Sequence, residues 1–183
     1  MSLLRIIIWM CAALCLLPCA AFARAKVTLP HSAPLTAVCV AEAARASGLP
    51  MAALIGILAT ENGKLGEALL NNNGTWDMGP FQFNTVHINE LADMGIAPEA
   101  VLQDGCTNAY AAAWLLRKEY NRTGDIWQAI GAYHSRTPHR RDAYIAQVKS
   151  NLARLSRSGI FALPLLAPDS APDTITPGME GGQ

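Results

Sequence analysis

The sequence has 183 residues, 51% of them hydrophobic, and its 14 basic and 14 acidic side chains give a formal net charge of zero. A neutral chain has no electrostatic footprint for nucleic acid or for an anionic lipid surface, so neither is an expected partner. A polymer bound by such a protein is recognised by shape and hydrogen bonds.

Residues 1–23 are typical of a secretory signal peptide. Arg5 precedes a short apolar run, and Ala21-Phe22-Ala23 is a small-x-small cleavage site. The apolar run is shorter than the roughly 20 residues of a membrane-spanning helix, which favours export over a permanent membrane span. The segment Leu16-Leu17-Pro18-Cys19 leaves a lipoprotein acylated at Cys19 as an alternative, although Pro18 stands where a small residue is expected.

The part after the cleavage site, roughly 160 residues, is long enough for one domain with its own core. Helical spacing of apolar residues predicts helices over 36–46, 50–61, 85–94, 104–121, 125–134 and 138–157. Pro50 suits a first helical turn, and Gly63 can stop the helix that carries Glu61. The predicted caps and first-turn residues of the later helices are Asp104, Asp125, Thr137 and Pro138.

The β candidate is the region 71–83, where Asn73-Gly74 can close a small hairpin. Residues 24–161 are therefore expected to form one mainly α domain. The segment 162–183 is rich in Pro, Gly, Ser and Asp and cannot bury enough apolar surface to stay ordered, so it is interpreted as a flexible tail.

Of the 5 cysteines, Cys39 and Cys106 lie beyond the signal peptide. An isolated pair in an oxidising compartment is most simply a disulfide, which here would connect the helix over 36–46 to the helix that begins near Asp104. The alternative is a catalytic thiol served by a histidine, as in papain-like peptidoglycan peptidases. Against it, Cys39 lies within an apolar helical run without a glycine or turn to expose it.

The acid in the last turn of the helix over 50–61 is the candidate catalytic residue. A carboxylate at Glu61 lies at the negative end of the helix dipole beside apolar side chains, and both effects disfavour its charged form. A glutamate that keeps its proton towards neutral pH can protonate a glycosidic oxygen as a general acid. A glutamate followed by Asn62-Gly63 is also typical of a solvated surface position. The other residues of the motif decide between this interpretation and a catalytic acid.

The motif continues after the acid. After an Asn/Gly-rich loop comes Asp77-Met78-Gly79-Pro80-Phe81-Gln82-Phe83-Asn84, and later Gly131-Ala132-Tyr133-His134-Ser135 is followed by Tyr144. Together with Glu61 they resemble the soluble lytic transglycosylase family of the lysozyme-like superfamily. That family has a catalytic Glu at a helix end, a loop, a Gly-apolar-Gln-apolar run, Ala-Tyr-Asn and a later Tyr. Pro80-Phe81 departs from the family's usual apolar pair.

The resemblance covers roughly residues 36–150 and implies a lysozyme-like helical domain with a small β-hairpin or irregular β region. It implies peptidoglycan glycan strands as substrate, cleavage of the β-1,4 bond between N-acetylmuramic acid and N-acetylglucosamine, and a 1,6-anhydro product without a cofactor. The variant with His134-Ser135 is most similar to members that accompany type IV secretion, conjugation and related envelope-spanning machines. A periplasmic location and such a machine as partner are therefore expected.

The resemblance also implies roles for single residues. Gln82 lines the groove near the acid, and Tyr133 reaches towards the Glu61 carboxyl and the acetamido group of the sugar. If the segment 81–84 is extended, Gln82 and Asn84 lie on one side and the two phenylalanines on the other. Tyr133 and Tyr144 can equally be core rings with wet hydroxyls. The expected substrate-binding set is Asp77, Gly79, Gln82, Asn84, Tyr133, His134 and Tyr144.

Asp77 has two interpretations. It can be the second carboxylate of a glycosidase, or a turn-former with a structural or groove-lining role, which we favour because Asp after Gly-Thr-Trp commonly caps its own backbone. The histidines at 31, 87, 134 and 139 show no metal-ligand spacing, so no metal site is expected. The alternative functions are a hydrolytic muramidase on the same scaffold, a non-catalytic glycan-binding assembly component and the Cys-His peptidase.

Overall fold

The computed structural model describes residues 25–30 and 32–159. The predicted signal peptide and the predicted tail lie outside the described residues. Within these two ranges, no helix combines the length and the apolar character that crossing a membrane requires. The elements are β1 Lys26–Thr28, α2 Ala37–Ala46, α3 Met51–Glu61, β2 Glu67–Leu70, β3 Trp76–Met78, β4 Phe83–Asn84, η1 Thr85–His87, α4 Ile88–Ala92, α5 Pro98–Gln103, α6 Gly105–Thr123, α7 Ile126–His134 and α8 Pro138–Arg157.

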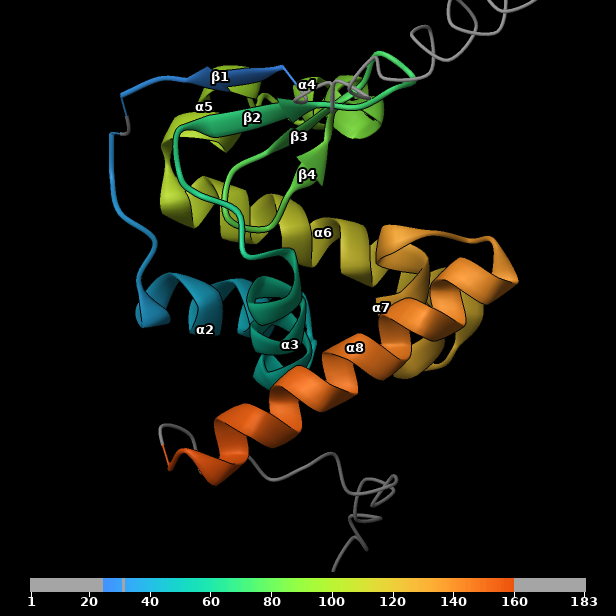
Figure 1. Ribbon diagram of the computed structural model, residues 1–183. Coiled ribbons are helices and arrows are strands. Elements are labelled where there is room, and N and C mark those ends of the chain that lie inside the picture. Colours follow the sequence, from blue (N-terminus) through green and yellow to red (C-terminus); the bar gives the residue numbers. More distant parts are fainter. Residues whose placement is uncertain (1–24, 31, 160–183) are drawn as a thin grey trace, which may run out of the picture.

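Helix α6 runs through the middle of the molecule, between the sheet with α4 and α5 on one side and α2, α3 and α8 on the other (Figure 1). Ala109, Ala112 and Leu116 pack into a helical cluster with residues of α2, α3, α7 and α8. Ala111 and Leu115 pack into a sheet-side cluster with residues of the sheet, α4 and α5. Both cores therefore share α6, whose small alanines allow neighbouring elements to approach closely.

The mainly α architecture predicted from the sequence is confirmed, and the later helices lie close to their predicted ranges as α6, α7 and α8. Asp104 accepts a hydrogen bond from the Thr107 amide at 2.7 Å, and Asp125 accepts one from the Gln128 amide at 2.8 Å, so both predicted caps are confirmed. Thr137 is the N-cap residue of α8, but its side chain makes no capping hydrogen bond.

The predicted helix over 85–94 is wrong in detail. The chain forms the 3-10 turn η1 and then the short helix α4, because the Asn84 side chain accepts from the Val86 amide at 2.9 Å and caps a tight turn. Helix α5 follows, which the sequence analysis did not predict. Pro50 is the N-cap of α3 rather than part of its first turn.

The end of α3 also differs from the prediction. Asn62, not Gly63, takes the left-handed conformation that ends the helix, with φ 49° and its amide bonded to the Leu58 carbonyl. Gly63 is needed for a different reason: a Cβ there would lie 2.1 Å from the Gly79 carbonyl oxygen. The absence of a side chain lets the segment after Glu61 contact the turn after β3.

The sheet is antiparallel in the order β1-β2-β3-β4. The predicted turn at Asn73-Gly74 is present, with Gly74 at φ 83°, and it connects β2 to β3 in a hairpin, but β2 ends at Leu70, before the predicted region 71–83. The Gly74 amide donates to the Asn71 carbonyl at 3.0 Å. Strands β1 and β4 extend this hairpin into a sheet, and β1 was missed because its three exposed residues show no alternation and are specified by pairing with β2.

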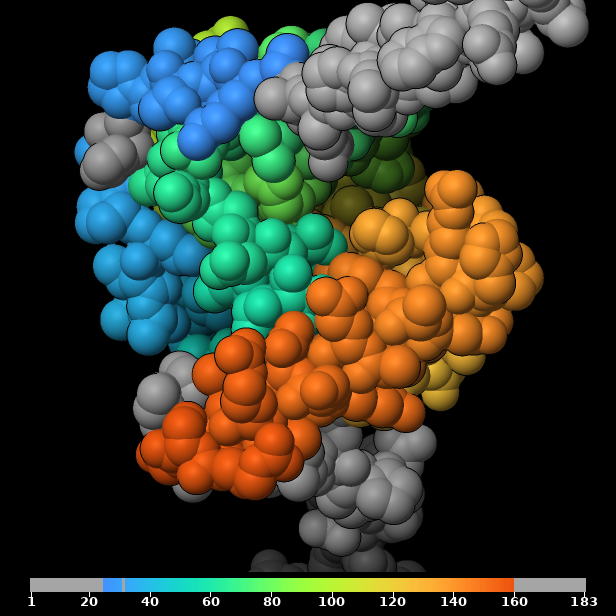
Figure 2. Space-filling model, viewed as in Figure 1, coloured from blue at the N-terminus to red at the C-terminus, as the bar shows by residue number. Residues whose placement is uncertain are grey.

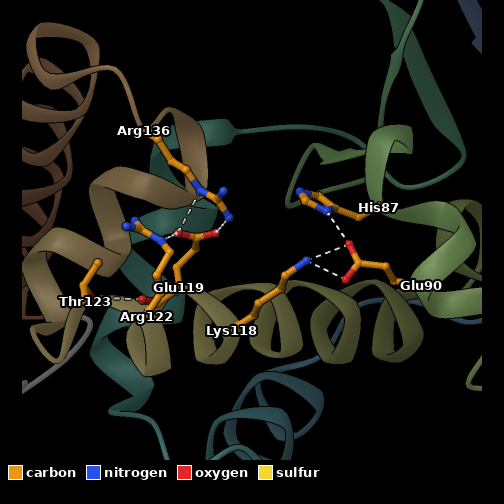
Figure 3. Close-up of polar contacts among 7 residues, drawn as sticks. All are labelled: His87, Glu90, Lys118, Glu119, Arg122, Thr123 and Arg136. Atoms are coloured by element: carbon orange, nitrogen blue, oxygen red, sulfur yellow. Dashed lines mark hydrogen bonds and ion pairs between the residues drawn. The ribbon is translucent and has the colours of Figure 1, made fainter.

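Ion pairs connect α6 to the elements on either side of it (Figure 3). Glu119, only 2% exposed, accepts from Arg122 at 2.8 Å and from Arg136, which precedes α8, at 2.5 Å. Burial by itself raises the pKa of Glu119, but the hydrogen bonds and charges of the two guanidinium groups outweigh it and leave that pKa lowered. On the other side, Glu90 of α4 accepts from Lys118 of α6 at 2.7 Å.

Cys39 of α2 and Cys106 of α6 have their sulfur atoms at bonding distance and their Cα atoms 4.9 Å apart, a separation that a disulfide can bridge. The pair closes a loop with a sequence separation of 67 and lies in the helical part of the molecule. Cys39 is buried, so the structure does not favour a solvent-accessible thiol there.

We predict that the Cys39→Ala/Cys106→Ala double variant loses stability and keeps its activity. In the chain-entropy account a loop of this length stabilises the folded state by about 4 kcal/mol. Chemical denaturation of wild type and variant measures the difference. Two alkylatable thiols in folded, unreduced wild-type protein would contradict the disulfide.

Candidate active site

Glu61 is the last residue of α3 and is partly buried. The hydroxyl of Tyr144, which is buried on α8, donates to Glu61 Oε1 at 2.6 Å. The sequence analysis expected Tyr133 to reach this carboxyl, but its hydroxyl donates to the Phe81 carbonyl at 2.8 Å. The hydrogen bond to the acid therefore comes from α8 and not from α7.

The surroundings of Glu61 stabilise its protonated form. Burial removes water from the carboxyl, and the negative charge of Asp77 adds to that effect, while the Tyr144 hydrogen bond acts in the opposite direction. The balance raises the pKa of Glu61 to about 7. Burial and the nearby Glu61 carboxylate also raise the pKa of Tyr144, so this tyrosine is a neutral donor. At neutral pH the acid can thus both give and take a proton.

Tyr133 lies where the two cores meet, because its ring packs against both the helical and the sheet-side clusters. Burial, followed by the charges of Glu61 and Asp77, raises its pKa well above the usual value. Tyr133 is therefore neutral. It lies near both carboxyl groups, but its hydroxyl donates to the Phe81 carbonyl.

His134 stacks on the Tyr144 ring, with centroids 4.7 Å apart and planes at 2°. Partial burial of the imidazole lowers the pKa of His134, with Asp77 opposing and Arg140 adding to the shift. A neutral imidazole therefore covers the ring that donates to Glu61.

Asp77 of β3 is paired across the sheet with Asn84 of β4. The Asn84 amide donates to Asp77 Oδ1 at 2.7 Å and to the Thr75 hydroxyl at 3.0 Å. Its carbonyl oxygen caps η1, as described above. The sheet thus fixes the Asp77 carboxylate close enough to Glu61 to raise the pKa of the latter.

The condition under which Gln82 and Asn84 would lie on one side is not met, because residues 79–82 form a tight turn and the extended strand β4 begins only at Phe83. Gly79 has φ 67° and Gln82 has φ 47°, both left-handed, and the Gln82 side-chain amide donates to the Gly79 carbonyl at 2.9 Å. Phe81 and Phe83 are both fully buried, in the helical and the sheet-side cluster respectively. The turn therefore directs one ring into each core.

Gln82 nevertheless lies beside the segment that follows the acid. A Cβ on Gly63 would come within 2.5 Å of Gln82 Nε2, and the Gly63 amide donates to the Pro80 carbonyl at 3.1 Å. The turn of residues 79–82 and the segment after Glu61 are thus in direct contact.

Asn108 was missed by the sequence analysis. It is fully buried on α6, its Nδ2 donates to the Met78 carbonyl at 3.1 Å and to the Val101 carbonyl at 2.9 Å, and its Oδ1 accepts from the Phe81 amide at 3.0 Å. The available signal was an amide side chain on the apolar face of an alanine-rich helix, where a polar group needs partners.

The contact of α3 with α8 was also missed. A Cβ on Gly56 would lie 2.7 Å from Val148, so the two helices approach closely there. Asn151 of α8 donates to the Thr60 hydroxyl at 3.0 Å, one residue before the acid. This packing fixes the distance between Glu61 and Tyr144.

The surface of the molecule is indented between the sheet region, drawn green, and the last two helices, drawn orange (Figure 2). In the described part of the chain, no group of three His, Cys, Asp or Glu side chains is placed to hold a metal ion. The arrangement offers acid and base chemistry by one carboxyl group, with neutral tyrosines and a second, hydrogen-bonded carboxylate beside it.

Curated proteins of several bacteria are similar to this chain. An X polypeptide of Escherichia coli is 38% identical over 92 residues, 47% of this chain and 54% of the relative. The invasion protein IagB of Salmonella typhimurium is 34% identical over 89 residues, 46% of this chain and 56% of the relative. The protein IpgF of Shigella flexneri is 33% identical over 110 residues, 60% of this chain and 71% of the relative. The chain spans about half the length of the first two relatives.

The family model for the transglycosylase SLT domain matches residues 38–154. This range includes the acid at the end of α3, the turn after β3 and the tyrosines of α7 and α8. It also covers the part of the chain in which the two cores meet around α6. More than half of the chain is matched, and the mainly α architecture with a small sheet agrees with the lysozyme-like fold predicted from the sequence. The chain therefore belongs to the family of transglycosylase SLT domains.

Proposed function

We propose that this protein is a peptidoglycan lytic transglycosylase. It cleaves the β-1,4 bond between N-acetylmuramic acid and N-acetylglucosamine and leaves a 1,6-anhydro end. The observation that carries the proposal is the Glu61 carboxyl, partly buried, bonded to a neutral tyrosine, and with its pKa raised to about 7. Membership of the SLT family supports the same reaction class.

In the proposed reaction Glu61 first acts as a general acid. Its proton moves to the glycosidic oxygen as the bond to the anomeric carbon breaks. The carboxylate that forms is stabilised by the Tyr144 hydroxyl, which already bonds to Oε1. The negative charge of Asp77 opposes that carboxylate, and it also favours the positive charge that develops on the sugar.

Glu61 then acts as a base. The acetamido carbonyl of the muramic sugar stabilises the anomeric carbon in place of a protein nucleophile. The Glu61 carboxylate removes the proton of that sugar's own 6-hydroxyl, whose oxygen bonds to the anomeric carbon. The carboxyl is protonated again at the end, and no water is consumed. This step needs the 6-hydroxyl held close while water is excluded.

A hydrolytic muramidase is the second candidate. The observation that favours it is Asp77, a carboxylate fixed by Asn84 near enough to raise the pKa of Glu61. A second carboxylate at this position can orient a water molecule for attack on the anomeric carbon. The two reactions differ in their product, since hydrolysis leaves a reducing end.

We further propose that the protein acts in the periplasm and makes local openings in the wall for an envelope-spanning apparatus. The resemblance to members that accompany secretion and conjugation machines supports this, and so does the similarity to a Salmonella protein named as an invasion protein. The Cys-His peptidase loses support because the sulfur atoms of Cys39 and Cys106 lie at bonding distance from each other.

We predict that Glu61→Gln abolishes product release, because an amide cannot donate the proton that the leaving oxygen needs, a step worth about 10²- to 10⁴-fold in rate. Mass spectrometry of muropeptides released from purified peptidoglycan measures the effect. Glu99→Gln, on the exposed surface of α5, is the matched control and should release wild-type amounts.

The products separate the candidates. Anhydro ends that disappear in Glu61→Gln support the transglycosylase, and reducing ends support the muramidase. Binding of glycan without release by wild type would favour a non-catalytic assembly component. Substantial activity in Glu61→Gln would overturn the assignment of the acid.

We predict that Tyr144→Phe shifts the alkaline limb of the pH profile upwards and lowers the maximal rate. The Tyr144 hydrogen bond lowers the pKa of Glu61, so its removal lets burial and Asp77 raise that pKa further. Rate measurements from pH 5 to pH 9 on both proteins test this. An unchanged limb would mean that the hydrogen bond does not act on the proton that limits turnover.

We predict that the burial of Glu61 also makes the folding stability depend on pH. The folded state binds the Glu61 proton more tightly than the unfolded chain, so this group's contribution to stability is lost as pH rises from about 4.5 to about 7. Glu61→Gln should gain on the order of 2–3 kcal/mol over wild type across that range. Denaturant unfolding at several pH values measures it, and parallel curves for both proteins would contradict it.

A further inference from the structure

Among the described residues, Asn108 and Glu119 are the fully buried polar side chains. They differ in the groups to which they bond. Glu119 bonds to arginine side chains at the surface, as Figure 3 shows. In the hydrogen bonds described above, Asn108 bonds only to backbone groups, which belong to β3, to the turn after it and to α5. It therefore determines where a stretch of main chain lies.

The fit between Asn108 and the turn is close. Its amide uses both donor and acceptor atoms, and replacement by an apolar side chain would leave the Met78 carbonyl, the Val101 carbonyl and the Phe81 amide buried without these partners. On the other side, a Cβ on Gly79 would lie 2.6 Å from Asn108 Nδ2. Asn108 and Gly79 together set the path of the turn against α6.

This turn adjoins Asp77, Tyr133 and the segment that follows the acid. Asp77 directly precedes Met78, and Tyr133 donates to the Phe81 carbonyl. The Gly63 amide, two residues after Glu61, donates to the Pro80 carbonyl. A shift of the turn would move the second carboxylate, a tyrosine hydroxyl and the segment after the acid together.

We infer that Asn108 is a positioning residue of the active site: through Met78 and the turn of residues 79–82 it holds Asp77, Tyr133 and the segment after Glu61 in the arrangement that the acid needs. It touches no reacting atom. The inference rests on the proposed function only where turnover is the readout.

Asn108→Leu tests it, because leucine keeps the approximate volume and suits a helix while all three hydrogen bonds are lost. Asn108→Ser is the milder variant, which keeps one hydroxyl as donor and acceptor. Leu91→Ala is the matched control: it removes buried methyl groups from the sheet-side cluster and leaves the Asn108 hydrogen bonds in place. All proteins are compared at a temperature at which each is folded.

The first readout is the Glu61 pKa, from a ¹³C NMR titration of labelled glutamate assigned with Glu61→Gln. In the Asn108 variants the Asp77 charge moves away and water reaches the carboxyl, so this pKa should fall by about half a unit or more. The second readout is muropeptide release, whose maximal rate should fall about tenfold or more, with glycan affinity changed less. Leu91→Ala should match wild type in both.

Each outcome decides one question. Folded Asn108 variants with the wild-type Glu61 pKa and rate overturn the inference, as does a shift of equal size in Leu91→Ala. If neither Asn108 variant folds while Leu91→Ala does, Asn108 serves folding alone and the inference fails. If wild type releases no product, the proposed function fails, and the NMR titration still decides the role of Asn108.

Discussion

The structure depends on a single helix that is buried on two sides. Helix α6 contributes Ala109, Ala112 and Leu116 to the helical cluster and Ala111 and Leu115 to the sheet-side cluster. Apolar burial on opposite sides forces the sheet and the helices α2, α3, α7 and α8 to meet around it. Tyr133 packs against both cores and so lies where they meet.

The electrostatics of the site follow from that arrangement. Glu61 ends a helix of one core, and Asp77 belongs to the sheet of the other, so the charge of Asp77 acts on Glu61 only because the cores are joined. Burial dominates the pKa of Glu61, Asp77 adds to it, and Tyr144 limits the shift. The carboxyl therefore keeps its proton up to near neutral pH. Its pKa is set by the balance between desolvation and a hydrogen bond, and no single neighbour determines it.

The order of short motifs identified much of the site from sequence. Glu61, Asp77 and Tyr144 were named in advance, and the structure places them together. The partner of the acid was assigned to Tyr133 instead of Tyr144, since motif order says which residues gather and not which atoms bond. Asn108 and Asn151 were not identified, because an amide on a helix reveals its backbone partners only when distant segments are in place.

Local patterns by themselves determined most helices, since helix formation and capping depend on residues within four positions, as Asp104 and Asp125 illustrate. They also determined the central hairpin, through Asn73-Gly74. Tertiary structure decided the strand β1, the left-handed turn at Gln82 and the hydrogen bond from Tyr144 to Glu61. Strand β1 and the hydrogen bond to Glu61 join residues far apart in the chain, 83 positions in the latter case, and the turn bonds through Phe81 to Asn108, 27 positions away. In these places burial and pairing override the local preference.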